Sequence, residues 1–224
     1  MQILRSKNEG FSLIELMIGM TVTLILLGVI SSIVFRSTSV RARESRKADA
    51  LVSAQAALNV MTREIANSGF GLFTDSVSQI PSNGLIIADS NTNRIRLRSN
   101  FENVGDYSPP TNGTVINTND PGEDITYFFD NATKSIVRYD AYGPDGPETS
   151  VVVNKISNVT FSYFNYTSSS STVTETSTPT SATGRVRLTV VVELDPVVGQ
   201  PDNQVVTFTS DVTLRNSNYM LRQY

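Results

Sequence analysis

Cysteine, histidine and tryptophan are all absent from the 224 residues of the chain. Without cysteine, the protein can form neither a disulfide nor a thiolate nucleophile. Without histidine, it lacks the usual general base, the Ser–His relay and the commonest ligand of zinc. These absences exclude most common catalytic designs, but they do not exclude carboxylate chemistry or cation sites built from oxygen ligands.

A strong charge of either sign is also missing, since the formal net charge is −3. Proteins that bind nucleic acid by neutralising phosphates carry a clear basic excess, so we expect no nucleic-acid partner. Hydrophobic residues make up 39% of the chain, which is enough for a folded domain with its own core.

A long apolar run lies near the N-terminus. It covers residues 11–35 and contains one charge, Glu15. As an α-helix it would be about 37 Å long, which is enough to span a bilayer. A secretory signal has a shorter apolar core followed by a small-residue cleavage site, which this run lacks. A plain membrane anchor leaves Glu15 unexplained, because a carboxylate in hydrocarbon costs roughly 2.5 kcal/mol or more.

The residues around the start of the run carry a recognisable motif. Residues 7–15 read KNEGFSLIE, in which a basic leader ends at Gly10 and is followed by Phe11, Ser12, Leu, Ile and Glu15. This order resembles the class III signal of type IV prepilins. The resemblance implies that residues 1–10 are a leader, and that a prepilin peptidase cuts between Gly10 and Phe11 and methylates the new amine of Phe11.

The chemistry of these residues agrees with the resemblance. Gly10 has no side chain, so a protease can approach its peptide bond closely. Cleavage would leave a cationic amine on Phe11, and Glu15 lies four residues further on, which is one helical turn. In the family it resembles, this glutamate pairs with the amine of a neighbouring subunit, which offsets the burial of both charges. A local alternative is a glutamate that only stabilises the positive end of the helix dipole.

The charges that flank the run disagree with the topology that the motif implies. The resemblance implies a bacterial inner-membrane precursor whose globular domain lies outside the cytoplasm. The leader holds two basic residues, whereas five follow the run, and the positive-inside rule therefore favours the opposite orientation. The basic residues are Arg5 and Lys7 before the run, and Arg36, Arg41, Arg43, Arg46 and Lys47 after it.

The helical pattern continues beyond the apolar run. Apolar residues recur at spacings of three and four, at Leu51, Ala54, Leu58, Met61 and Ile65. No proline interrupts residues 11–67, and Gly69 suits the position just after a helix end. We therefore expect one helix from residue 11 to about 67, whose second half, residues 36–68, is amphipathic and packs on a domain.

Strands and turns dominate the pattern from residue 70 to 224. Residues 130–133 predict a hairpin turn, and the long strands predict a half-buried antiparallel sheet. A helix followed by such a sheet gives an α+β fold. Residues 167–183 are rich in Ser and Thr, and predict a solvated loop between two strands. The predicted strands cover 84–88, 93–98, 124–129, 134–139, 150–154, 158–165, 185–194 and 204–214.

Two short segments resemble PilW-type minor pilins and the J-type minor pseudopilins of type II secretion. They are residues 63–70 and residues 212–216. The resemblance implies a non-catalytic subunit that takes part in the assembly or initiation of a type IV pilus. It implies a prepilin peptidase, other pilins and the inner membrane as partners. A minor pseudopilin of a type II secretion or DNA-uptake system is the alternative within the same class.

Carboxylates leave two further hypotheses open. Asp140, Asp145 and Glu148 lie in a Gly/Pro-containing loop, and their oxygens could hold calcium, although the spacing matches no EF-hand and an ordinary turn is the alternative. A membrane-anchored hydrolase that uses Asp or Glu is the alternative from another class. No carboxylate pair lies in a recognisable catalytic motif, so we expect neither a catalytic residue nor a cofactor.

Overall fold

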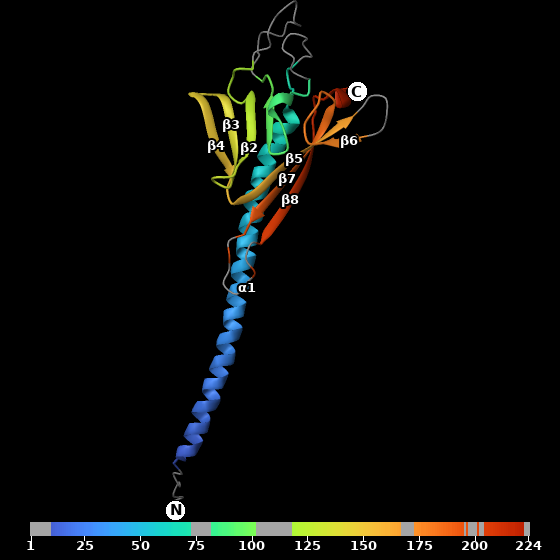
Figure 1. The fold of residues 1–224 in the computed structure, drawn as a ribbon. Helices are drawn as coiled ribbons and strands as arrows, with labels where there is room; N and C mark the ends of the chain where they lie inside the picture. Colours follow the sequence, from blue (N-terminus) through green and yellow to red (C-terminus); the bar gives the residue numbers. More distant parts are fainter. Residues whose placement is uncertain are drawn as a thin grey trace, which may run out of the picture. The chain divides into compact units, whose positions relative to one another are not determined.

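The computed structural model describes residues 10–72, 82–101, 118–166, 173–194, 196, 201 and 204–221. Its first element is the helix α1, Leu13–Asn67, shown in Figure 1. The sequence predicted a start at residue 11, but the Leu16 N–H donates to the Ser12 carbonyl at 3.2 Å. Ser12 is therefore the N-cap, and the helix begins one residue after it.

The other end of α1 confirms the predicted helix stop. Gly69 has a φ of +81°, in the left-handed region that glycine tolerates best. A Cβ atom at this position would lie 2.1 Å from the carbonyl oxygen of Ser82. The backbone of the turn therefore requires glycine both for its conformation and for the close approach of a second segment.

The chain divides into two compact units, and the boundary between them lies inside α1. The first contains Met1–Ser45 and Val197–Asp202, and the second contains Arg46–Pro196 and Asn203–Tyr224. Of α1, the first unit holds the apolar part, and the second unit holds the part that packs on the strands. The residues of α1 that are buried all belong to the second unit.

The second unit contains two four-stranded antiparallel sheets rather than the single sheet that the sequence predicted. The first sheet is a meander in the order β1-β2-β3-β4, and the second has the order β6-β5-β7-β8 (Figure 1). The strands of the first sheet are β1 (Arg94–Arg98), β2 (Asp124–Asp130), β3 (Ser135–Gly143) and β4 (Gly146–Val153). The second sheet contains β5 (Ile156–Tyr166), β6 (Val173–Thr176), β7 (Thr183–Glu193) and β8 (Val205–Thr213), and a short helix, α2 (Asn218–Leu221), follows.

One hydrophobic core joins both sheets to the second half of α1. Alternate residues of β7, and of the middle of β5, are buried in this core, as the period of two of a strand with one buried face requires. The helix contributes Ala57 as well as the predicted stripe, but Leu51 is half exposed, and Ala50 packs against the core in its place. The largest fully buried side chains of this core include Met61, Ile65, Tyr127, Tyr163, Phe161, Ile95, Ile136 and Leu188.

One strand prediction needs correction, and one turn is confirmed. The predicted strand 84–88 is instead a single bridge between Leu85 and Leu97 followed by a 3₁₀ helix, Ile87–Asp89. The predicted hairpin at residues 130–133 is confirmed, since β2 and β3 pair with Asp130 opposite Ser135. Lys134 completes the turn at a φ of 51°.

Part of the Ser/Thr-rich stretch differs from the predicted solvated loop. Residues 167–172 lie outside the described residues, but Val173–Thr176 forms β6 and pairs with β5. Thr183 is fully buried, and its hydroxyl donates to Asn165 Oδ1 at 2.6 Å. Threonine favours strands, and here its hydroxyls also find partners, so residues 173–183 belong to the fold. The stretch still connects β5 to β7, which pair antiparallel as predicted.

Candidate functional site

Gly10 lies exposed before the first turn of α1. A Cβ atom built on it would meet no described atom within 4 Å, and its φ is outside the left-handed region. The fold of the described residues therefore does not require glycine at this position. Access of a protease offers another reason for glycine here, because the absence of a side chain lets the enzyme approach the Gly10–Phe11 bond closely.

Phe11 follows Gly10 and is 87% exposed. The apolar residues after it are exposed as well, from Leu13 to Phe35. No described part of this chain covers the Phe11 ring. Burying it therefore requires a different environment, either lipid or another protein chain.

Glu15 caps the helix that follows Ser12. The Ser12 backbone N–H donates to Glu15 Oε2 at 3.2 Å, which is one half of a capping box. The carboxylate therefore lies at the positive end of the α1 dipole, and the local role considered for Glu15 is present in the isolated chain. Because Phe11 precedes the helix, it is not placed one helical turn from Glu15. Pairing of Glu15 with the amine of a neighbouring subunit stays a prediction.

The first part of α1 has the properties of a membrane-spanning segment by length and composition. Its most apolar 18-residue window has a mean hydropathy of 2.4, and none of that window is buried. The hydroxyl groups of its two threonines are satisfied within the helix, so they add little cost in hydrocarbon. Thr21 donates to the Met17 carbonyl at 2.7 Å, and Thr23 donates to the Gly19 carbonyl at 2.7 Å.

Comparison with known proteins identifies a family motif at the N-terminal end of the chain. Residues 5–31 match the family model of the prokaryotic N-terminal methylation motif. The chain therefore carries the class III signal expected from its sequence, which is the signal of type IV pilin-like proteins. No curated protein and no solved structure matches the chain. The match ends at residue 31, so the second unit is characterised by its own geometry alone.

The carboxylates considered for calcium lie at the β3–β4 hairpin. Asp140 is buried, and its Oδ2 accepts hydrogen bonds from the Gly122 N–H at 2.9 Å and from Arg138 Nη1 at 3.3 Å. Asp145 is exposed in the turn, and Glu148 is exposed on β4 opposite Asp140. Within the described residues, no group of three or more acidic side chains is placed to hold a metal ion. Asp140 instead holds the turn before β2 against β3.

An ionic group that the sequence did not reveal joins α1 to the first sheet. The Tyr127 hydroxyl donates to Glu64 Oε2 at 2.5 Å, and Arg138 Nε donates to the same oxygen at 3.2 Å. Burial raises the pKa of Tyr127, and the negative charge of Glu64 raises it further. The phenol therefore stays protonated and remains a donor. These three residues lock the rotation of the helix over β2 and β3.

A second ionic group lies on β1 and β2. Asp124 is almost fully buried, and it accepts from Arg96 Nη2 at 2.7 Å and from Arg98 Nε at 2.9 Å. The hydrogen bond to Asp124 is the main reason why the pKa of Arg96 is raised above its usual value. The alternation in RIRLR could have predicted the charged face of β1, but not its acidic partner on the next strand.

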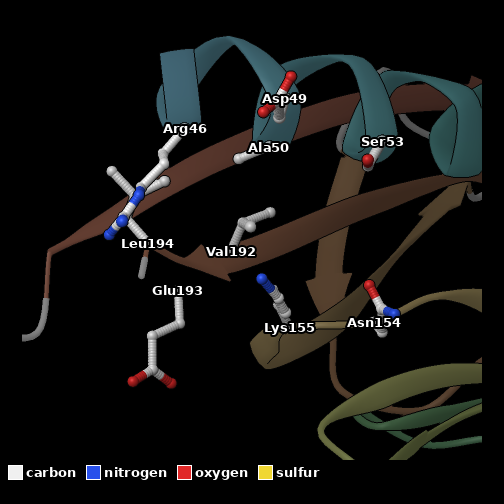
Figure 2. Close-up of a pocket in the computed structure, with 9 residues that line it drawn as sticks. All are labelled: Arg46, Asp49, Ala50, Ser53, Asn154, Lys155, Val192, Glu193 and Leu194. Atoms are coloured by element: carbon white, nitrogen blue, oxygen red, sulfur yellow. The ribbon is translucent and has the colours of Figure 1, made fainter. Parts of the chain in front are cut away.

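Two pockets lined by described residues of the second unit are small. Figure 2 shows one of about 180 Å³ between α1, the turn after β4 and the end of β7. Lys155 reaches toward Val192 in this view, and the Glu193 carboxylate points away. A second pocket of about 220 Å³ lies beside Phe101 and Arg63. Both are below the roughly 300–1,000 Å³ of usual ligand sites, so neither outweighs the N-terminal motif as a functional site.

Proposed function

We propose that this chain is a minor pilin, a non-catalytic subunit that takes part in the assembly or initiation of a type IV pilus. The observation that carries the proposal is the methylation motif at residues 5–31, together with the apolar part of α1, which is exposed throughout the described chain. Such a segment needs lipid or other helices around it. A pilin meets these two surroundings in turn, first as a membrane-held precursor and then as a filament subunit.

Processing would precede assembly. A prepilin peptidase removes residues 1–10 and methylates the amine of Phe11, while α1 anchors the precursor in the inner membrane. The second unit then lies outside the cytoplasm. The exposed position of the Gly10–Phe11 bond, outside the helix and in contact with no described side chain, supports its access to the peptidase.

Glu15 would guide the next step. Its carboxylate accepts one hydrogen bond, from Ser12, so Oε1 has no donor among the described residues. A carboxylate that is half satisfied and lies at hydrocarbon depth costs several kcal/mol. The methylated amine of a neighbouring subunit would supply the missing charge and donor. Pairing therefore favours the assembled state over the free subunit.

Glu15→Ala tests this role of the carboxylate. Membrane insertion should be at least as efficient as in the wild type, because a costly charge is removed. Entry into filaments should fall severely, because the amine of the neighbour loses its partner. The measurement is the amount of the chain that co-purifies with sheared filaments, relative to the amount in the membrane.

Glu44→Ala is the matched control, since it removes an exposed acid from the same helix outside the motif. Both variants should reach the membrane, and the control should also reach the filament. Normal incorporation of Glu15→Ala would refute the pairing. Quantitative mass spectrometry of the same filaments should find the wild-type chain rare. A dominant chain would contradict the minor role and leave the pilin class intact.

A further inference from the structure

A group of arginines follows the apolar part of α1. The run ends at Phe35, and Arg36, Arg41 and Arg43 come within the next eight residues. No acidic residue occurs between Glu15 and Glu44. We call these three residues the arginine collar. The collar is thus a purely positive segment placed where a spanning helix would leave the hydrocarbon.

Two members of the collar are available for an external partner. Arg36 and Arg41 are exposed, and their side chains form no hydrogen bond or ion pair with any described residue. Arg43 is half-buried and has a contact of its own. Arg36 and Arg41 therefore differ from the arginines of the first sheet, where Arg96 and Arg98 bind Asp124.

Helix geometry distributes the collar around α1. At 3.6 residues per turn, Arg41 lies about 140° from Arg36 around the helix axis, and Arg43 returns to within about 20° of Arg36. At 1.5 Å per residue, Arg41 lies about 7.5 Å further along the axis than Arg36. The polar layer on each side of a bilayer is about 5–8 Å thick, so the collar extends through it.

We propose that the arginine collar binds anionic phospholipid headgroups and thereby fixes the depth of α1 in the bilayer. Guanidinium groups stay charged at all relevant pH values and bind phosphate oxygens with two parallel hydrogen bonds. Their long side chains reach the headgroups from either side of the helix. The proposal rests on membrane insertion of α1 and not on entry into a filament.

The collar also has a bearing on topology. If the second unit lies outside the cytoplasm, the arginines occupy the side that the positive-inside rule disfavours. Anionic headgroups of that leaflet supply these charges with counterions at the membrane surface. The attraction is about 1 kcal/mol for each basic residue near an anionic surface and is screened by salt.

The test uses the purified full-length chain in nanodiscs of mixed phosphatidylcholine and phosphatidylglycerol. Electron paramagnetic resonance of spin-labelled lipids measures the preference of the chain for phosphatidylglycerol over phosphatidylcholine. We expect a clear preference in the wild type at low salt. Arg36→Gln with Arg41→Gln should lower the preference by up to about fivefold for each arginine, as the energy per charge implies. Arg36→Lys should retain most of it.

Arg63→Gln with Arg94→Gln is the matched control, because it removes two exposed arginines from the second unit. It should leave the preference unchanged. The basic residues of the leader are present in every variant, so their contribution cancels in the comparison. An equal preference in the collar variant and the wild type would overturn the proposal, as would a wild type without any preference. A chain that fails to enter nanodiscs would contradict the membrane assignment and the proposal together.

A last experiment distinguishes binding of lipid headgroups from binding of free phosphate. Inorganic phosphate is added at the ionic strength of a matching chloride solution. The collar should respond equally to both salts, because phosphate acts only by screening. A greater loss of preference in inorganic phosphate would show a site for free phosphate and overturn the assignment to lipid.

Discussion

The two parts of α1 belong to one continuous helix, but their side chains suit different surroundings. Residues 13–35 are apolar on every side and exposed, whereas residues 46–67 bury one stripe against two sheets and turn polar residues outward. The side chains of the first part pack against no other described segment of the chain, whereas the second part contributes to the hydrophobic core of the second unit. Apolar residues spaced three and four apart therefore mark the part of the helix that packs on its own domain. A helix that is apolar on every side marks the part that other molecules must cover.

Substitutions by alanine in the two parts should separate them most strongly. Met61→Ala empties a fully buried site in the core and should lower the free energy of unfolding of the second unit by about 2–5 kcal/mol. Leu24→Ala removes a comparable side chain that is 67% exposed and should leave that unfolding unchanged. Denaturant unfolding of the full chain in detergent, followed by tyrosine fluorescence, measures both. Equal losses would mean that the apolar part packs on the folded domain.

Glycine substitutions should show the same contrast at the backbone. Gly69→Ala introduces a Cβ atom into a left-handed residue and against the Ser82 carbonyl, so it should cost about 1–3 kcal/mol or more. Gly28→Ala has open space around it and replaces a poor helix former, so it should not destabilise α1. Thermal unfolding of both variants measures the difference. A Gly69→Ala protein with wild-type stability would contradict the turn described here.

The surface of the second sheet should give the smallest effect. Arg187 Nε donates to Asp211 Oδ1 at 2.7 Å, and this hydrogen bond is the main cause of the lowered pKa of Asp211. A carboxyl with a lowered pKa stabilises the fold above its unfolded pKa of about 4, and this stabilisation is lost as the pH falls through the folded pKa. Both side chains are more than a third exposed, so the pair should contribute less than about 1 kcal/mol.

Asp211→Asn should therefore lower stability slightly at neutral pH. The difference from the wild type should shrink in acid, as the pH falls toward the lowered pKa of Asp211. Unfolding midpoints measured at neutral pH and near pH 3 check both statements. Asp211 Oδ2 also lies 3.6 Å from Arg185 Nη1. A large loss of stability at neutral pH would contradict the small contribution expected from these exposed ion pairs.

Local signals predicted the parts of the fold that local chemistry determines. The helix end at Gly69 and the turn after Asp130 each depend on one or two residues, and both are confirmed. The strand β6 was hidden, because its Val and Thr residues lie within a stretch of Ser and Thr that reads as a loop. The division into two sheets depends on strand pairing between distant segments, which periodicity does not report.

The same division applies to the functional residues. The methylation motif is contiguous, so it was found from the order of residues 7–15 alone and is confirmed by the family comparison. The group of Glu64, Tyr127 and Arg138 was missed, because its members come from one helix and two strands far apart in the chain. Only the folded second unit brings them together.

The N-terminal residue of the mature chain tests the account most directly. Mass spectrometry of the protein recovered from filaments should show a chain that begins at a methylated Phe11 and lacks residues 1–10. Gly10→Val should remain uncut, because a β-branched side chain crowds the peptide bond that must be cleaved, although nothing in the described fold opposes it. An intact Met1 on wild-type protein from working filaments would contradict the account.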